Sequence, residues 1–470
     1  MANSHHTTEI NERFDFSKVA NVAYLLIGVG LVLALIGFFV MPEPPGRVHH
    51  GGGHGDHHGE HSTIEAPATQ HAETDIHSVA DEPAEHGDEH GHGHERSAHD
   101  RPITKGTRLL ANILLNSVYF ITLTLGALFF LTIHTIGNAG WHVAIRRIPE
   151  AISSYLPVGV IGLAILFLFL PDLYDWAYGT DHIISKKAGY LNQGFFITRN
   201  IIFFAIWIGA AFWLRNLSQK EDNLTNWDQN RPTWIFRRST TIAAIHIILF
   251  ALSYSFFTVD WIKSLEPHWF STIFMVYVFA GSMLSAMVTM YFIILVAKKY
   301  GLMSYVNDSH LHDLGKYTFG FSVFWGYIWV AQYLLIWYSN IPEEGAYYVT
   351  RYRVHDATYL GYAPMFYLNV LVNFLIPFVA LMTRNAKRRP EIYVPVGIIL
   401  LYGHWHDLFV MIMPGAVSQF AGIGFLELGS FMLFAGIFIA VVFRALSRTN
   451  LVPTNHPYLE ESLHHSTGPV

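Results

Sequence analysis

Cysteine is absent from the 470-residue chain. Without thiols the chain forms no disulfide, no cysteine-ligated iron–sulfur cluster and no covalent c-type haem attachment. Charged residues are also scarce, at 14%, whereas soluble domains carry about 25%. Hydrophobic residues make up 52% of the chain, with 35 Phe, 24 Tyr and 12 Trp. This balance disfavours a soluble domain and favours an all-α integral membrane protein.

Several motifs with known chemistry are missing as well. The sequence has no glycine-rich phosphate loop, no nucleophile elbow and no basic patch, so we expect no nucleic-acid partner. The first 17 residues include Glu9, Glu12 and Asp15 and lack the basic region of a cleaved signal, so the first apolar run is expected to be a retained helix. His246 and His404 are available for haem, but no expected helix offers two histidines several turns apart, which argues against a cytochrome b.

Long apolar runs dominate the rest of the chain. A helix that crosses a bilayer needs about 20 mainly apolar residues. The stretches that satisfy this rule predict ten transmembrane helices, at 18–41, 107–137, 153–178, 192–216, 238–261, 268–297, 313–340, 357–383, 391–413 and 421–446. Polar tails remain at 1–17 and 447–470, and one long loop at 42–106.

The long loop is of low complexity, with "HHGGGHGDHHGEH" and later "EHGDEHGHGHER". It has almost nothing to bury, so we expect a disordered, acidic spacer. Imidazole and carboxylate ligands suit zinc, copper or nickel, which leaves a weak metal-buffering alternative without fixed ligand spacing. The leading candidate ligands are His49, His50, His54, His57, His58 and His61.

Lysine and arginine are unevenly divided between the two sides of the expected bundle. Of the 29 such residues, 18 fall on the side that holds both termini. Positive loops face the cytoplasm. We therefore expect a protein of the bacterial inner membrane, with both termini in the cytoplasm and the long loop in the periplasm.

The segment "TVDWIKSLEPHWFST" at 258–272 places many ionisable groups between two apolar runs. Counting from the start of the fifth helix puts it at the outer interface, as a tight hairpin with Pro267 in the first turn of the sixth helix. An alternative is an outer-face site that handles protons or a quinone headgroup. Its candidate residues are Asp172, Asp260, Glu266 and His268.

A second polar group lies in "LLYGHWHDLFVMIMP". His404 and Asp407 are three residues apart and share a helical face, with His406 turned away. Glu427 of the last helix is expected at similar depth. Three interpretations of this group stay open: hydrogen-bonded packing between helices, a proton relay and a metal-ligand pair. Ionisable residues in a membrane are costly and often mark functional sites, which supports the second and third.

The inner half of the expected bundle holds further isolated histidines. Isolated histidines in an apolar core usually have their hydrogen bonds satisfied and play a structural part. Together, however, these would suit a proton half-channel on the inner side that meets the group around His404 and Asp407. The candidate proton path comprises His246, His312, Asp313, His404, His406, Asp407 and Glu427.

Three long motifs carry a family resemblance: "FFTVDWIKSLEPHWFSTIF", "LHDLGKYTFGFSVFWGYIWVAQYLLIWYSNIPEE" and "HWHDLFVMIMP". They resemble the second large membrane component of bacterial alternative complex III, a quinol:cytochrome c oxidoreductase. That component is similar to the NrfD-like quinone-interacting anchors. "GNAGWHVAIRRIPEAI" and "HPYLEESL" look like further signatures, so the resemblance covers about residues 107–465.

The resemblance implies ten transmembrane helices with two four-helix bundles, helices two to five within 107–261 and helices six to nine within 262–413. Helix one at 18–41 and the last segment at 414–446 would lie outside them. It also implies a subunit without redox cofactors, a homologous NrfD-like sister subunit where quinol is mainly oxidised, and periplasmic multihaem cytochrome c and iron–sulfur subunits. Lipids, menaquinol or another quinol, and a terminal oxidase are further expected ligands or partners.

Three functional hypotheses follow. The favoured one is a non-redox subunit of a respiratory quinol oxidoreductase complex, acting as scaffold and proton-conducting path. The second is a subunit with its own quinone site at the periplasmic face. The third, suggested by the His-rich loop and "HWHD", is a metal-ion transporter with ligands near the membrane midplane.

Overall fold

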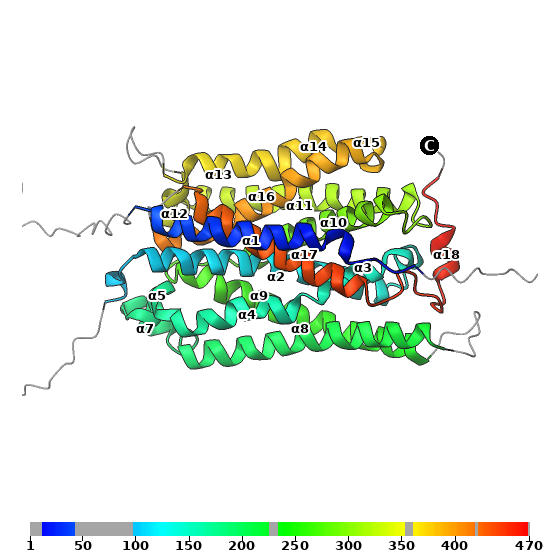
Figure 1. Cartoon of the computed structure of the whole chain (residues 1–470). Helices are drawn as coiled ribbons and strands as arrows, with labels where there is room; N and C mark the ends of the chain where they lie inside the picture. The colour runs from blue at the N-terminus through cyan, green and yellow to red at the C-terminus, as the bar shows by residue number, and fades with distance from the viewer. Residues whose placement is uncertain (1–11, 43–96, 225–233, 353–360, 419–421, 469–470) are drawn as a thin grey trace, which may run out of the picture.

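The chain folds into a bundle of long helices that run along one common axis (Figure 1). The computed structural model describes residues 12–42, 97–224, 234–352, 361–418 and 422–468. Ten helical segments in this part are long and apolar enough to cross a membrane. In the same ranges the only β pairing is the isolated bridge between Ser97 and Thr180. The prediction of an all-α, ten-span membrane protein is confirmed.

Eight of the spans are single α-helices. They are α1 Ser17–Val40, α2 Lys105–Ile136, α8 Gln193–Asp222, α9 Trp234–Trp261, α10 Phe274–Lys299, α11 Asp308–Ser339, α16 Pro390–Val417 and α17 Phe425–Leu446. Two spans are built from pieces, namely α3 Arg147–Ser153 with α4 Leu156–Leu166, η3 Phe167–Phe169 and α5 Leu170–Leu173, and α13 Ala363–Val370 with η5 Leu371–Leu375 and α14 Ile376–Ala380. Short connecting helices are η1 Ala98–Asp100, η2 Gly140–Ile145, α6 Asp175–Tyr178, α7 His182–Lys187, η4 Lys263–Leu265, α12 Pro342–Tyr352, α15 Arg384–Arg388 and α18 Leu459–Leu463.

Prolines and buried side chains explain where the helices depart from the predicted ranges. Helix α10 begins at Phe274 rather than at 268, so the placement of Pro267 in its first turn is wrong. Trp269 is buried instead, and its ring stacks on Tyr347 at 3.8 Å, which holds this stretch in a folded connector. In the broken third span, Pro171 cannot donate the helical hydrogen bond expected near the break.

The first and last spans pack closely against each other. A Cβ on Gly30 would lie 2.4 Å from the backbone nitrogen of Leu433, and one on Gly429 would lie 2.3 Å from that of Ala34. Small residues allow such close approach of helix backbones in a membrane, where apolar area itself gives little drive for association. The α1–α17 pair is therefore built on backbone contact.

Helices α2 and α10 form the centre of the molecule. Helix α2 contacts α4 and α9 on the side of the first predicted bundle, and α10 and α16 on the side of the second. One continuous apolar core joins both sets. The division into two separate four-helix bundles therefore stays a prediction.

Both described chain ends lie on one side of the bundle, because the Glu12 backbone carbonyl accepts a hydrogen bond from Leu451 N at 2.8 Å. We call this side, which also holds Arg146 and Lys299, the terminal side. The opposite side holds Arg101, α7 and α12 (Figure 1).

Candidate functional site

Asp260 is sealed inside the opposite half of the bundle. It is 0% exposed at the end of α9 and forms an ion pair with Arg199 of α8, with contacts of 2.7 and 2.8 Å. Tyr190 Oη donates at 2.8 Å and Asn200 Nδ2 at 3.0 Å. Asp260 lies at the end of the fifth span, as the predicted hairpin had it, and an arginine from a neighbouring helix, which the prediction did not include, holds its carboxylate inside the protein.

Glu266 is also bound by an arginine. Arg351 of α12 donates to Glu266 at 2.5 Å and to the carbonyls of Val410 and Met411 on α16 at 3.0 and 3.1 Å. Its guanidinium carbon lies 3.4 Å above the Tyr347 ring. Arg351 therefore fastens the connector before α10 to α12 and to the end of α16.

The two other predicted outer-face residues lie at the protein surface. His268 Nε2 is 2.8 Å from Asp181 Oδ2, and its side chain is 36% exposed. Asp172 is exposed, and its backbone carbonyl accepts from Arg101 at 2.7 Å. The four candidate residues of the outer-face site thus belong to separate local contacts.

Glu427 lies on a seam between α17 and α2. Its Oε1 accepts from Arg108 at 2.8 Å and from Asn112 at 3.1 Å. A polar chain continues through Ser430 and Asn116, although it does not reach Asp407 by any hydrogen bond within the described ranges. Glu427 and Asp407 were expected at similar depth in the membrane, but no described hydrogen bond links them.

Asp407 is the exception among these carboxylates. It is 1% exposed on α16, and three neutral groups donate to it: Tyr277 Oη of α10, Trp325 Nε1 of α11 at 2.9 Å and Asn369 Nδ2 of α13 at 2.6 Å. Across the described residues no lysine or arginine pairs with it. Its charge is not fixed by a neighbouring cation.

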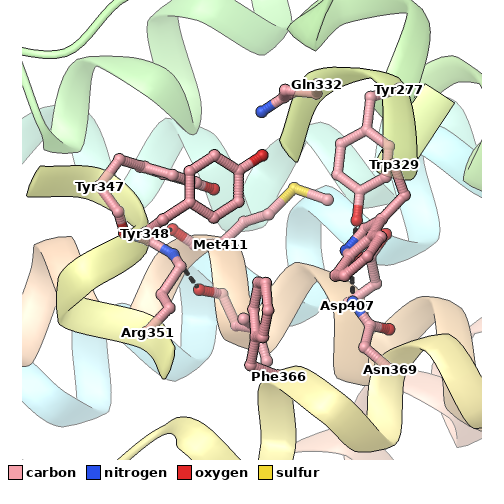
Figure 2. A pocket seen from close by; sticks show the side chains of 11 residues that line it. Tyr277, Trp329, Gln332, Tyr347, Tyr348, Arg351, Phe366, Asn369, Asp407 and Met411 are labelled. Carbon is pink, nitrogen blue, oxygen red and sulfur yellow. Dashed lines mark hydrogen bonds between the residues drawn. The ribbon is translucent and has the colours of Figure 1, made fainter. Parts of the chain in front are cut away.

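Asp407 lines a small pocket near the opposite side (Figure 2). The pocket has a volume of about 20 Å³, room for about one water molecule. Arg351, Tyr347, Tyr348 and Gln332 form its other polar walls. Arg351 on the pocket wall also holds Glu266, whose side chain is 23% exposed, although no described hydrogen bond joins Arg351 to Asp407.

A π-helical turn, η5, directly follows α13, whose Asn369 donates to Asp407, and contains a second amide, Asn373. Pro377 has no N–H for the carbonyl of Asn373, and Ser322 Oγ donates to that carbonyl instead, at 2.6 Å. The widened turn η5 places Asn373 Nδ2 2.6 Å from Asn369 Oδ1 and 3.0 Å from the carbonyl of Gly403. Such turns are frequent at functional sites.

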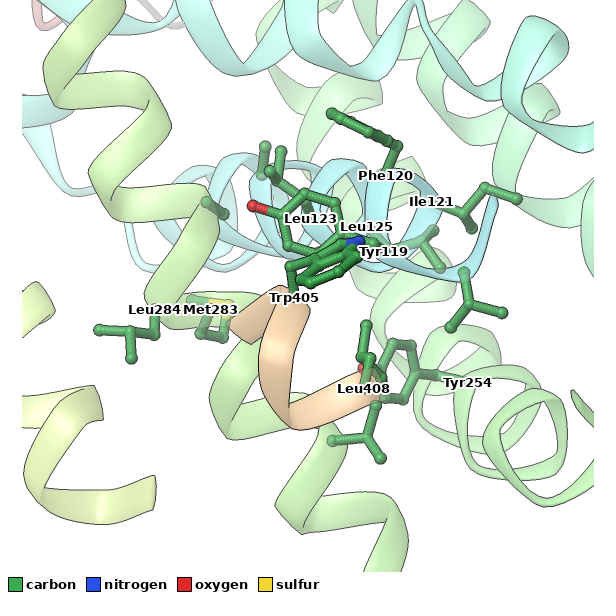
Figure 3. Close-up of a cluster of buried hydrophobic side chains, with 14 of the residues drawn as sticks. Tyr119, Phe120, Ile121, Leu123, Leu125, Tyr254, Met283, Leu284, Trp405 and Leu408 are labelled. Atoms are coloured by element: carbon green, nitrogen blue, oxygen red, sulfur yellow. The ribbon is translucent and has the colours of Figure 1, made fainter. Parts of the chain in front are cut away.

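An apolar cluster fixes the orientation of α16. Trp405 and Leu408 pack with Tyr119 of α2 and Met283 of α10, all buried (Figure 3). Since Leu408 faces this cluster, the preceding residue, Asp407, is turned towards α11 and α13. The site is therefore held by packing between helices that are far apart in sequence.

The predicted histidines on the spans differ in their surroundings. His404 faces Gly281 and the Tyr119 ring, and neither of its ring nitrogens has a hydrogen-bond partner in the described structure. His246 is likewise buried without a partner there. His406 contacts the carbonyl of Met365 at 2.8 Å, away from His404, as expected. No hydrogen bond between described residues joins His246 to His404.

Polar groups are dense on the terminal side. Asp313 lies 2.5 Å from Lys316 and 2.6 Å from His465, whereas the Nδ1 of the buried His312 has no described partner. His142 in η2 is buried, and its Nδ1 lies 2.5 Å from the Ala139 carbonyl. Burial, with His134 nearby, lowers the pKa of His142 to about 3.

The same side also holds a buried ion network. Arg146 and Arg147 are each 1% exposed and bind Glu150 at 3.0 and 2.8 Å. Arg147 also pairs with Asp222 at the end of α8. This network joins α3 to α8 and is structural in character.

The important residues that sequence reasoning missed are the partners of the carboxylates. Asn369 and Asn373 stand four apart in the apolar run "FYLNVLVNFLIPF", a spacing that indicates one polar helix face. Arg199 and Arg351 gave no comparable signal, because each pairs with a residue at least 61 positions away.

No cluster of three or more metal-ligating side chains occurs among the residues that the structure describes. The loop histidines His49, His50, His54, His57, His58 and His61 lie outside the described residues. Neither protein-family models nor curated proteins gave a match to this chain.

Proposed function

We propose that this chain is a membrane subunit, without redox centres of its own, of a respiratory quinol-oxidising complex, and that Asp407 transfers protons within it. The motif resemblance to the alternative complex III family supports membership of such a complex. The lack of cysteine fits a chain whose haem and iron–sulfur partners are separate subunits. The proposed setting is a bacterial cytoplasmic membrane with both termini inside.

One observation carries the proton role. Asp407 is a buried carboxyl on a membrane-crossing helix whose described partners are all neutral hydrogen-bond donors. A buried charge without a counter-charge is costly, so gain and loss of a proton are the natural responses of such a group. Asp260 and Glu266 are each held by an arginine, which weighs against the alternative of a quinone site that uses them as proton acceptors.

The three donors suggest how the site accommodates both forms. All of them satisfy the ionised carboxylate. The protonated carboxyl needs an acceptor for its own O–H. The indole of Trp325 accepts nothing, and Asn369 turns its Nδ2 towards Asp407 and its Oδ1 towards Asn373. The Tyr277 hydroxyl can reverse from donor to acceptor, so it would follow the protonation of Asp407. The adjoining pocket would connect this pair towards Glu266 at the opposite side.

Membership of a complex is tested by gentle purification through a tag on this chain. Haem absorption bands and several co-eluting subunits are the expected result. A colourless, single-chain product would contradict this part of the proposal and favour the transporter hypothesis.

The proton role is tested in the purified complex reconstituted into liposomes, by counting protons translocated per electron. Asp407→Asn keeps the shape of the side chain but cannot ionise, so it should abolish the share of proton transfer that passes through this site. Asp407→Glu should restore part of it. Asp172→Asn, an exposed carboxylate on the same side, is the matched control. An unchanged proton-to-electron ratio in Asp407→Asn would exclude Asp407 from the path.

A further inference from the structure

A second, larger pocket opens on the opposite side, between α7 and the connector after α9. Its volume is about 490 Å³. Lys186 and Lys187 contribute from one edge and Lys263 from the other, and no carboxylate is among its described lining residues. Asp407 and its partners are not part of it, so this pocket is separate from the proposed proton site.

The polar groups of this pocket are mainly hydrogen-bond donors. Lys187 uses one of its three N–H groups on the Pro267 carbonyl at 2.5 Å. Trp269 is 3% exposed, and its indole N–H has no partner in the described structure. Asp260 pairs with Arg199, and Asp181, which is also near enough to Lys187 to favour its charge, pairs with His268. The walls therefore suit a ligand that is anionic and rich in acceptors.

Apolar side chains form another part of the pocket wall. Leu191 and Val259 line the pocket, and Phe270, which is 56% exposed, stands at its rim. The pocket lies where α9 ends, at the level expected for lipid headgroups if the apolar spans cross the bilayer. A ligand in this pocket should therefore be amphipathic, with its charged group near the lysines and its hydrocarbon part near Phe270.

We propose that this pocket binds an anionic phospholipid, with the phosphate between Lys187 and Lys263 and an acyl chain along Leu191, Val259 and Phe270. The volume fits the headgroup and the upper part of the chains, and the rest would continue into the bilayer. A neutral quinone offers acceptor oxygens and an apolar tail but no charge for the lysines to recognise.

The test is lipid binding to the purified, delipidated protein with its partners, followed by native mass spectrometry. Phosphatidylglycerol and phosphatidylcholine with the same acyl chains are titrated separately. In the double variant Lys187→Gln/Lys263→Gln each amide still donates hydrogen bonds but carries no charge. It should weaken phosphatidylglycerol binding about thirtyfold and leave phosphatidylcholine binding unchanged, on the basis of two membrane-surface lysines.

Two controls keep the result interpretable. Lys187→Arg/Lys263→Arg retains the charges and should retain phosphatidylglycerol binding, which separates charge recognition from a damaged fold. Lys299→Gln, exposed on the terminal side, should change nothing. Equal binding of the two lipids, equal loss of both in the glutamine variant, or displacement of phosphatidylglycerol by a quinone that binds the glutamine variant undiminished would each overturn the proposal.

Discussion

Asp260 and Asp407 are the same side chain in two differently built environments. Both are buried on membrane-crossing helices, with 0% and 1% exposure. Asp260 meets a guanidinium, a phenol and an amide, whereas Asp407 meets a phenol, an amide and an indole. The difference in kind is the cation, which holds Asp260 in an ion pair, whereas the described partners of Asp407 are all neutral. Burial alone therefore does not distinguish the two carboxylates, and the proton transfer proposed for Asp407 depends on this difference.

The largest expected effect is on the ion pair. Asp260→Asn leaves Arg199 buried without a counter-charge, which should cost about 3–5 kcal/mol of unfolding free energy. Thermal unfolding in detergent measures this. The double variant Arg199→Gln/Asp260→Asn strands no charge and should be more stable than the single variant. If Asp260→Asn were as stable as the wild type, the assignment of Asp260 as a structural anchor would fail.

The two tyrosines sharpen the comparison. Tyr277→Phe and Tyr190→Phe each remove one hydroxyl that donates to a buried carboxylate, at a cost of about 1–3 kcal/mol. Only Tyr277→Phe should also slow proton transfer, because Tyr190 belongs to the arginine-held site. Proton flux in liposomes, measured beside thermal stability, distinguishes them. Equal flux in both variants would remove Tyr277 from the proposed mechanism.

A buried histidine provides an acid-sensitive reference on the terminal side. The pKa of His142 is about 3 in the folded protein, against 6.5 for an unperturbed histidine. The unfolded chain therefore binds the proton first, and stability that is complete above about pH 6.5 is lost as the pH falls. The loss is about 1.4 kcal/mol per pH unit below that value. Unfolding at pH 7.5 and 5.5 should show it, and His142→Gln should reduce this dependence; an unchanged pH profile in that variant would contradict the assignment.

The effect on stability is expected to be modest where the effect on function is greatest. Asp407→Asn strands no cation, but its new NH2 group faces the Trp325 N–H, which accepts nothing, so the unfolding free energy should fall by about 1–3 kcal/mol, less than in Asp260→Asn. A loss as large as in Asp260→Asn would show that Asp407, like Asp260, serves the fold. The same thermal unfolding experiment therefore ranks both carboxylates on one scale.

Helix positions were largely predictable, because apolar length is a local property of the sequence. Departures occur where a proline or a distant side chain intervenes, as at Pro377 just after the π turn and Trp269 in the connector before α10. The spacing of His404 and Asp407 predicted that they share one helical face, and in the structure both contact α10, at Gly281 and Tyr277. What lay opposite them was not encoded in that spacing.

The sequence by itself determined that the chain is a ten-span helical membrane protein, since runs of apolar residues leave no other stable way to satisfy the backbone in lipid. It also singled out the carboxylates that are costly to bury. Only the tertiary structure decided which of them is paired with an arginine and which has neutral partners alone in the described part of the chain. Arg199 reaches Asp260 and Arg351 reaches Glu266 from other helices, whereas packing turns Asp407 towards neutral donors. Electrostatic partners depend on which helices meet, and that is fixed by packing across the whole chain.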